Sequence, residues 1–242
     1  MKNSIPDFEG FTKQTFKFFS LLEKNNNTDW FNKNREMYEG QLVIPSKALV
    51  SSIGPFFNQL NPAIRTEPKF NSTLMRINKD MRFAKGAPYK NYFLVHFGRF
   101  KMDSEFYVYL DKTGLSYGLF INNTVGDNLH FTENISKFKN NVEDVFLKYK
   151  LEGKFNFSTF GKEPELLRKN FKFVKDAELL ADTKFILLEK NITFENKIIY
   201  SATFLNELIK TFSKLYPLYC FAISPAPLKL LLEFEENLGV AS

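Results

Sequence analysis

The chain has 242 residues, of which 44% are hydrophobic and 17% aromatic, and it carries a formal net charge of +6. This length is sufficient for one large domain, and the apolar content excludes a wholly disordered chain. The single cysteine excludes an internal disulfide, as is typical of a protein in a reducing cytoplasm.

No apolar core of a secretory signal is visible in the N-terminal segment "MKNSIPDFEG". The most apolar long stretch, residues 215–232, contains three prolines and a lysine, so it is too interrupted to cross a bilayer. From these features we expect a soluble, cytoplasmic protein without a membrane partner.

The first third of the chain predicts helices. Apolar residues recur at helical spacing in 8–24, and the polar run "NNNTD" ends that helix and caps the next. The second helix covers 30–42. A third covers 45–60, where Pro45 suits a first turn.

The middle of the chain predicts a sheet. Alternating or continuous β-forming residues occupy 72–77, 92–100, 105–111 and 115–121. A turn at 112–114, with Gly114 able to adopt positive φ, joins the last two segments as a hairpin. We therefore expect an antiparallel meander of about four strands.

The last part of the chain is mixed. The pattern predicts an amphipathic helix over 129–150, a short strand in 154–160 and a short helix over 164–171. A strand at 184–192, a helix over 195–216 that Pro217 ends or kinks, and a terminal helix over 227–237 follow. The predicted fold class is α+β, with N-terminal helices, a central antiparallel β-meander sheet and C-terminal helices. No linker divides it, so we expect one domain over 1–242.

Positive charge is concentrated in one region. Residues 65–101 hold nine Lys or Arg and two acidic residues, a local charge of +7, so the rest of the chain carries −1. This placement favours a surface that faces an anion, although a solvated basic face has the same composition.

The stretch "INKDMRFAKGAPYKNYF", residues 77–93, lies at the centre of that region. If its cations converge, guanidinium and ammonium groups surround a phosphate or carboxylate. The predicted ligand-binding residues are Arg76, Asp80, Arg82, Tyr89 and Lys90. Asp80 has two readings: it acts on a ligand as a base or by orienting an arginine, or it neutralises Arg76 or Arg82 and holds the loop.

Three aromatic residues are possible stacking or groove-lining groups: Trp30, Tyr107 and Tyr109. Each has an alternative role, Trp30 as a core anchor and the tyrosines as part of a solvated sheet face. His96 and His130 have no metal-ligand spacing with each other or with the one cysteine, so no metal is predicted. Phosphate-loop and dinucleotide motifs are missing from the sequence, and no cofactor is predicted.

Two short motifs resemble those of a known family. The first comprises Leu22, Asn25, Asn26, Trp30 and Phe31, and the second Asp80, Arg82, Phe83, Lys85, Pro88, Tyr89 and Lys90. With the tyrosine-rich hairpin and the late "YPLYCF", this order resembles a bacterial and fungal family known as domain of unknown function DUF 2461. The resemblance covers residues 8–222, which leaves 223–242 as a C-terminal helical extension.

The chain departs from the family pattern at the second motif. It has Lys79 where the family has Arg, Ala84 where the family has Ser, and Gly86 and Ala87 in place of an Asp-Lys pair. The family has no established activity, so the resemblance implies a fold and the location of a site but no reaction.

Three hypotheses of function follow. The first is a pocket, built by the five residues of the motif, for a small molecule that bears a phosphate or carboxylate. The second is a nucleic-acid-binding module that uses the basic 65–101 region, with Tyr107 and Tyr109 as stacking platforms. The third is a protein-interaction or structural domain in which the motif only supports the fold. Whether the protein is an enzyme, and its oligomeric state, stay open.

Overall fold

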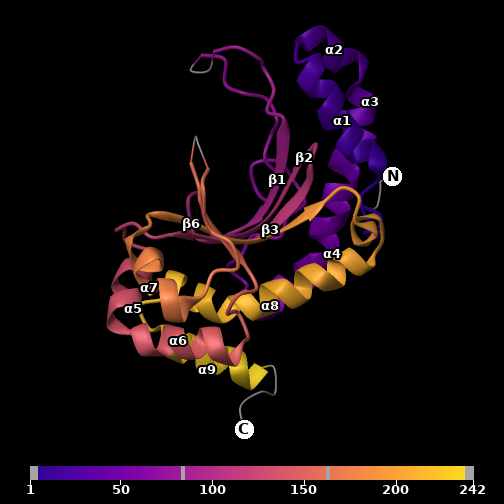
Figure 1. Ribbon diagram of the computed structural model, residues 1–242. Helices are drawn as coiled ribbons and strands as arrows, with labels where there is room; N and C mark the ends of the chain where they lie inside the picture. The colour runs from indigo at the N-terminus through magenta and orange to yellow at the C-terminus, as the bar shows by residue number, and fades with distance from the viewer. Residues whose placement is uncertain (1–4, 83–84, 162–163, 238–242) are drawn as a thin grey trace. The chain divides into compact units, whose positions relative to one another are not determined.

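The fold is α+β, with helices at both ends and a central six-stranded antiparallel sheet. It is seen in a computed structural model that describes residues 5–82, 85–161 and 164–237 (Figure 1).

The first helices are α1 (Lys13–Lys24), α2 (Thr28–Lys33), α3 (Arg35–Tyr38), the π-helix η1 (Glu39–Val43) and α4 (Ile44–Leu60). The strands are β1 (Tyr92–Phe97), β2 (Glu105–Asp111), β3 (Gly114–Asn122), β4 (Asn156–Thr159), β5 (Leu166–Arg168) and β6 (Phe185–Thr193), in the spatial order β1-β2-β3-β6-β4-β5. The later helices are α5 (Phe131–Lys137), α6 (Lys139–Lys148), α7 (Phe173–Asp182), the 3₁₀-helix η2 (Lys197–Tyr200), α8 (Thr203–Ile223) and α9 (Pro227–Asn237).

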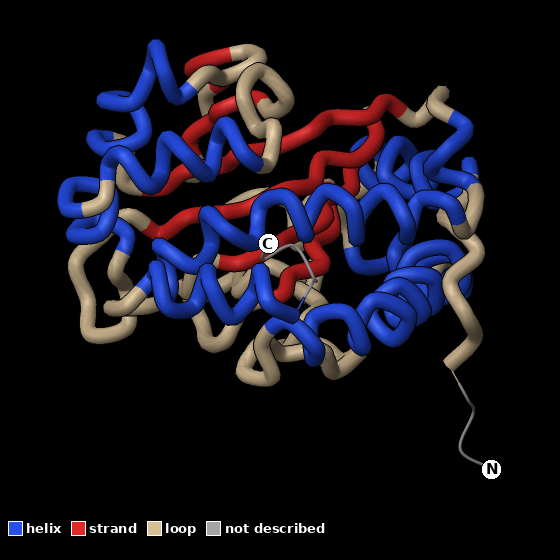
Figure 2. The backbone as a smooth tube through the Cα atoms, turned by 90° about the horizontal axis from the view of Figure 1, so that it is seen from below, coloured by secondary structure: helices blue, strands red, loops and turns tan. Residues whose placement is uncertain are grey.

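The chain divides into two compact units. Unit 1 comprises Met1–Phe97, Tyr107–Ser116 and Asn191–Ile209, and unit 2 comprises Gly98–Phe106, Tyr117–Lys190 and Lys210–Ser242. The course of the backbone through helices and strands can be followed in Figure 2.

The core of unit 1 is aromatic. Phe18, Phe19 and Leu22 of α1 are completely buried. Phe57 of α4 stacks on Phe97 of β1, with ring centroids 4.6 Å apart. Because α4 shows the spacing that puts apolar residues on one face, its packing against β1 follows from the sequence pattern.

A proline shapes the start of α4. Pro45 has no N–H, so it cannot donate to the carbonyl of Gln41, four residues earlier. The Thr15 hydroxyl of α1 donates to that carbonyl instead, at 2.7 Å. The π-helix just before α4 widens the turn at this point. The second helix predicted over 30–42 is therefore interrupted: it is divided among α2, α3 and η1.

Burial decides the course of α8 in unit 2. Pro217 does not end the helix, which was one of the two effects expected of it, because α8 continues to Ile223. Leu218, Tyr219 and Phe221 after the proline are all fully buried. Burying several large side chains stabilises the helix by more than the roughly 3 kcal/mol that an internal proline costs. None of the helices that the structure describes combines the length and apolarity needed to span a bilayer.

Other predicted elements are corrected by the structure. Residues 164–171 do not form a helix, because β5 pairs antiparallel with β4 through Leu166 and Arg168. The predicted helix over 129–150 is two helices that meet at Phe138. The predicted strand 72–77 is reduced to isolated bridges, among them Leu74 with Val95 of β1. Helix α7 occupies a segment in which the sequence pattern predicted no element.

The C-terminal helix belongs to the core of unit 2. Phe234 of α9 is 4% exposed, and its ring lies 4.9 Å from that of Tyr216. Glu235 accepts a hydrogen bond from the Tyr149 hydroxyl at 2.6 Å and pairs with Lys148 at 2.8 Å. The helix expected to be an extension therefore closes the aromatic core.

Replacing Phe234 tests this role of α9. Phe234→Ala should lower the free energy of unfolding by about 3–5 kcal/mol, because it removes a buried ring and leaves a cavity. The matched control is Leu232→Ala on the same helix, where the side chain is 52% exposed and the change should be within about 0.5 kcal/mol. Urea unfolding of both variants measures the difference. Equal effects would show that α9 is not part of the core.

Candidate functional site

The predicted site lies on a two-stranded arm of unit 1, which we call the basic arm and define as residues 76–90. Its backbone pairs antiparallel: the Lys79 N–H donates to the Pro88 carbonyl and the Lys90 N–H donates to the Ile77 carbonyl, each at 2.8 Å. Asn78 lies opposite Tyr89. The motif residues Phe83 and Ala84 are outside the described residues. Figure 1 shows the arm in magenta, extending beyond β1.

Gly86 adopts an unusual backbone conformation within the arm. Its φ is +85°, a conformation that an L side chain rarely adopts. A Cβ at this position would meet no atom within 4 Å. The backbone conformation, and not a close contact with another part of the chain, therefore accounts for a glycine at this position.

Tyr89 is a core residue. It is 5% exposed, and its ring stacks on Phe31 with centroids 4.2 Å apart. The Asn26 side chain accepts from the Tyr89 N–H at 3.0 Å and donates to the Tyr89 carbonyl and to Asn91 Oδ1, both at 2.9 Å. The two motifs that suggested the family thus meet: Asn26 and Phe31 of the first hold Tyr89 of the second.

Asp80 pairs with Arg82. The carboxylate accepts from Arg82 Nη2 at 2.7 Å, from Nε at 3.0 Å and from the Arg82 backbone N–H at 3.1 Å. The Arg82 side chain, and its backbone N–H to a lesser degree, lower the pKa of Asp80. These contacts favour the second reading of Asp80, in which it neutralises Arg82 and holds the loop. The pair is exposed, with 81% of the Arg82 side chain accessible.

Lys90 and Lys79 lie near one another. The Lys90 Nζ donates to the Arg76 carbonyl at 2.8 Å and lies 3.0 Å from Met75 Sδ. Burial, and the nearby Lys79 ammonium to a lesser degree, lower the pKa of Lys90. Among the described residues, neither lysine forms an ion pair with a carboxylate. The described part of the chain therefore holds two like charges together without a carboxylate paired to either one.

The Arg76 side chain has a contact partner different from those of Arg82 and Lys90. Its guanidinium lies 5.2 Å from the centroid of the Phe70 ring. The five predicted residues thus share one arm, but the contacts lead to four places: Asp80 with Arg82, Arg76 on Phe70, Tyr89 in the core, and Lys90 at the Arg76 carbonyl. Lys79, which was not in the predicted set, lies near Lys90.

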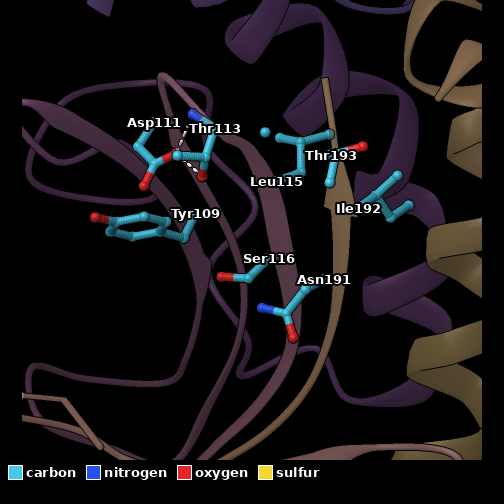
Figure 3. Close-up of a pocket in the computed structure, with 9 residues that line it drawn as sticks. Tyr109, Asp111, Thr113, Leu115, Ser116, Asn191, Ile192 and Thr193 are labelled. Atoms are coloured by element: carbon cyan, nitrogen blue, oxygen red, sulfur yellow. Dashed lines mark hydrogen bonds between the residues drawn. The ribbon is translucent and has the colours of Figure 1, made fainter. Parts of the chain in front are cut away.

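The predicted aromatic residues divide in a similar way. Tyr107 is 4% exposed and belongs to the interior, whereas Trp30 is partly exposed and packs 6.1 Å from Phe18. Tyr109 is more accessible, stacks on Tyr92 at 5.0 Å, and lines a surface pocket of about 230 Å³ (Figure 3).

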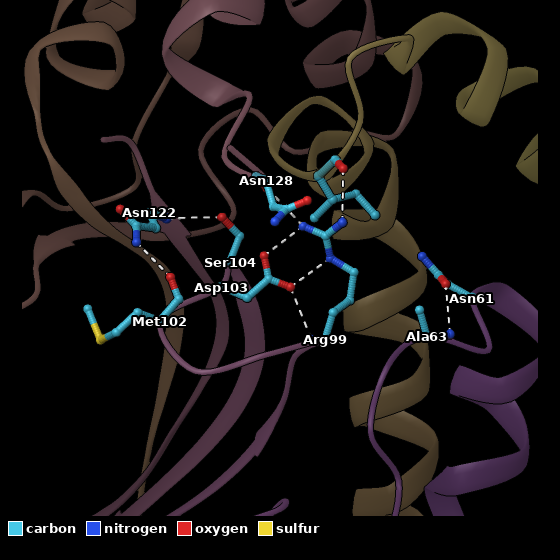
Figure 4. A network of polar contacts seen from close by, with 9 residues as sticks. Asn61, Ala63, Arg99, Met102, Asp103, Ser104, Asn122 and Asn128 are labelled. Carbon is cyan, nitrogen blue, oxygen red and sulfur yellow. Dashed lines mark hydrogen bonds and ion pairs between the residues drawn. The ribbon is translucent and has the colours of Figure 1, made fainter. Parts of the chain in front are cut away.

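One cation of the 65–101 region is structural and lies in unit 2. Arg99 Nε and Nη2 donate to the two oxygens of Asp103 at 2.8 and 2.9 Å, and the Asp103 side chain is fully buried (Figure 4). The same guanidinium donates to the carbonyls of Ile223 and Asn128, at 3.0 and 3.1 Å. Breaking such a buried pair typically costs about 3–5 kcal/mol. Arg99 is therefore a structural cation of unit 2.

The fold and site define an α+β protein with a basic hairpin arm. The Asn26 side chain of the first motif forms hydrogen bonds with the Tyr89 backbone of the second and with Asn91, and we call these three contacts the clamp. A family model described as "Conserved hypothetical protein (DUF2461)" matches residues 14–221, and the chain belongs to this family. The match confirms the resemblance seen in the two motifs. A search of curated proteins finds no match.

Replacing Asn26 tests the clamp. Asn26→Ala should lower the free energy of unfolding by about 2–4 kcal/mol, because it removes three hydrogen bonds and leaves the Tyr89 backbone groups without their partner. Asn32→Ala is the control, since Asn32 is exposed and accepts only from Arg35. Chemical denaturation gives the two values. If Asn26→Ala is no more costly than Asn32→Ala, the clamp does not hold the arm.

Proposed function

We propose that the basic arm binds the anionic group of a small molecule, a phosphate or a carboxylate. The observation that supports this most directly is the Lys79–Lys90 pair. On an antiparallel ribbon in which 77 pairs with 90 and 79 with 88, Lys79 and Lys90 are diagonal neighbours on one face, about 7–8 Å apart at Cα. An anion between the two ammonium groups would relieve their repulsion.

The residues of the arm have different roles in this proposal. Lys90 and Lys79 supply the charges that face the anion, and Arg76 and Arg82 add positive potential. Asp80 keeps the Arg82 guanidinium in place, and Tyr89 fixes the backbone from which Lys90 extends. A cytoplasmic location, as expected from the composition, would expose the arm to phosphorylated and carboxylated metabolites. No catalytic step is proposed.

Nucleic-acid binding is the second candidate, and the exposure of the Arg82 side chain at the outer part of the arm favours it. The stacking platforms that it would use argue against it. One of the two, Tyr107, is buried, which leaves Tyr109 as the single platform of the pair. The third candidate, a purely structural motif, draws its support from the Asn26–Tyr89 clamp.

A thermal-shift screen separates these candidates. Phosphorylated metabolites, nucleotides and short oligonucleotides are added to the wild type, to Lys79→Gln and to Lys90→Met. A small-molecule anion at a hundredfold excess over its Kd should raise the Tm of the wild type by about 5 °C, and the shift should disappear in both variants. Lys17→Gln on α1, which removes an exposed charge elsewhere in unit 1, should keep the full shift.

Two outcomes would contradict the small-molecule proposal. Shifts produced only by oligonucleotides, and abolished by salt, would favour the nucleic-acid module. Small-molecule shifts that persist in both lysine variants would place the anion elsewhere.

The pKa of Lys90 gives a pH prediction. Because burial and Lys79 lower this pKa, the ammonium should lose its proton below the ordinary lysine value of about 10.4. Sulfate, whose charge is constant above pH 7, should therefore bind more weakly as pH rises through the lowered value. Titration calorimetry between pH 7 and 10 measures this. Lys90→Arg, which keeps its charge, should show a flatter profile, and an equal fall in both proteins would contradict the role of Lys90.

The lowered pKa of Lys90 makes folding stability depend on pH in the opposite direction from anion binding. Between the lowered value and about 10.4, the unfolded chain binds more protons at Lys90 than the folded chain does, so this residue makes the free protein more stable as pH rises. Binding and stability should thus change in opposite directions with pH, which separates loss of the ligand from loss of the fold.

A further inference from the structure

Three neighbouring strands of unit 1 contribute polar residues to the pocket beside Tyr109, which Leu115 and Ile192 also line. Tyr109 and Asp111 come from β2, Ser116 from β3 and Asn191 from β6. Figure 3 shows these four side chains on the same side of the strands, with Leu115 and Ile192 turned away. Hydroxyl, amide and carboxylate groups thus surround the edge of an aromatic ring.

This lining suits a ring that carries hydroxyl groups. Serine and asparagine both donate and accept hydrogen bonds, and a carboxylate accepts from hydroxyls. An aromatic face packs against the apolar C–H face of such a ring. Asp111 Oδ1 already accepts from the Thr113 N–H and hydroxyl, both at 2.6 Å, which fixes the carboxylate at the rim of the pocket.

The pocket and the Lys90 ammonium lie on the same face of unit 1. The Lys90 Nζ contacts Met75 Sδ, and the Met75 N–H donates to Leu94 of β1, which makes these two a cross-strand pair. Since side chains alternate along a strand, Met75, Leu94 and Tyr92 share one face. Tyr92 in turn stacks on Tyr109.

The spacing between the arm and the pocket is short. Lys90 precedes Tyr92 by two residues, so their Cα atoms are at most about 7 Å apart. Tyr92 and Tyr109 then continue the surface to the pocket with ring centroids 5.0 Å apart. A phosphate near Lys90 and a ring at Tyr109 are therefore within the span of one small molecule.

We propose that the ligand is the phosphate ester of a hydroxylated ring, a sugar phosphate either free or as part of a nucleotide. Its phosphate binds Lys90 and Lys79, its ring lies along Tyr92 and Tyr109, and its hydroxyls bind Ser116, Asn191 and Asp111. This proposal rests on the proposed function, because it adds the ring to the anion that the basic arm would hold.

Titration calorimetry with four probes tests the proposal: inorganic phosphate, a free hexose, the hexose 6-phosphate and adenosine monophosphate. The wild type should bind one of the two phosphate esters at least tenfold more tightly than it binds inorganic phosphate or the hexose. Ser116→Ala and Asn191→Ala should each weaken that ester about five- to tenfold, the effect of one lost hydrogen bond, without changing the affinity for inorganic phosphate. Asn32→Ala in α2 should leave both affinities unchanged.

The outcomes distinguish this proposal from the proposed function. In one outcome, Lys90→Met loses affinity for inorganic phosphate and both esters equally, while Ser116→Ala and Asn191→Ala bind as the wild type does. The arm then binds anions, and the proposal about the ring is overturned. If no phosphate compound binds, or if Lys90→Met binds them all normally, the proposed function fails and this proposal fails with it. Tighter binding of adenosine monophosphate or of the hexose phosphate identifies which source of the shared chemistry the site prefers.

Discussion

The contact on which the candidate site depends is the clamp of Asn26 on the backbone of Tyr89. One amide side chain serves both the N–H and the carbonyl of Tyr89 and also donates to Asn91. With Phe31 stacked on the Tyr89 ring, the residue before Lys90 is fixed on both its polar and its apolar side. The direction of Lys90, and therefore the position of any charge that the arm offers, follows from a loop more than sixty residues earlier in the chain.

The same clamp explains how a short, highly charged segment stays ordered. An isolated two-stranded ribbon is at best marginally stable in water. Ile77 and Tyr89 supply buried anchors, the hydrogen bonds of the clamp satisfy the Tyr89 backbone, and Asp80 offsets one of the exposed guanidinium groups. Lys90 and Lys79 are left next to each other, and their repulsion is a cost that stabilisation elsewhere in the fold must offset. Binding sites often carry such local costs.

The sequence predicted the fold class and most elements because the helices α1, α4 and α9 and the strands β1, β2 and β3 carry clear periodic patterns. It failed where tertiary contacts override local preference: Pro217 lies in a helix kept by burial, and Leu166 joins an edge strand through its pairing with β4. For the site, the motif located the arm, but charge alone could not show that Tyr89 is buried. Lys79 was visible as the position where the family has Arg, whereas Ser116 and Asn191 are ordinary strand residues that only the sheet brings together.

The strongest reason to regard the arm as a binding element is that other cations of the basic region are paired with carboxylates, whereas Lys79 and Lys90 form no such ion pair among the described residues. If the basic region served only solubility, its cations would be dispersed over the surface or paired, as Arg99 is with Asp103 in unit 2 and Lys69 is with Glu67 in unit 1. Lys90 is instead half-buried beside a second ammonium, with a carbonyl and a sulfur atom as its direct contacts. Burial strengthens the attraction of an ammonium for an anion, because water competes less for the charge. A half-buried lysine beside a second ammonium lowers the stability of the free protein, and a bound anion would offset that cost, which is the behaviour expected of a ligand-binding residue and not of a solvated surface charge.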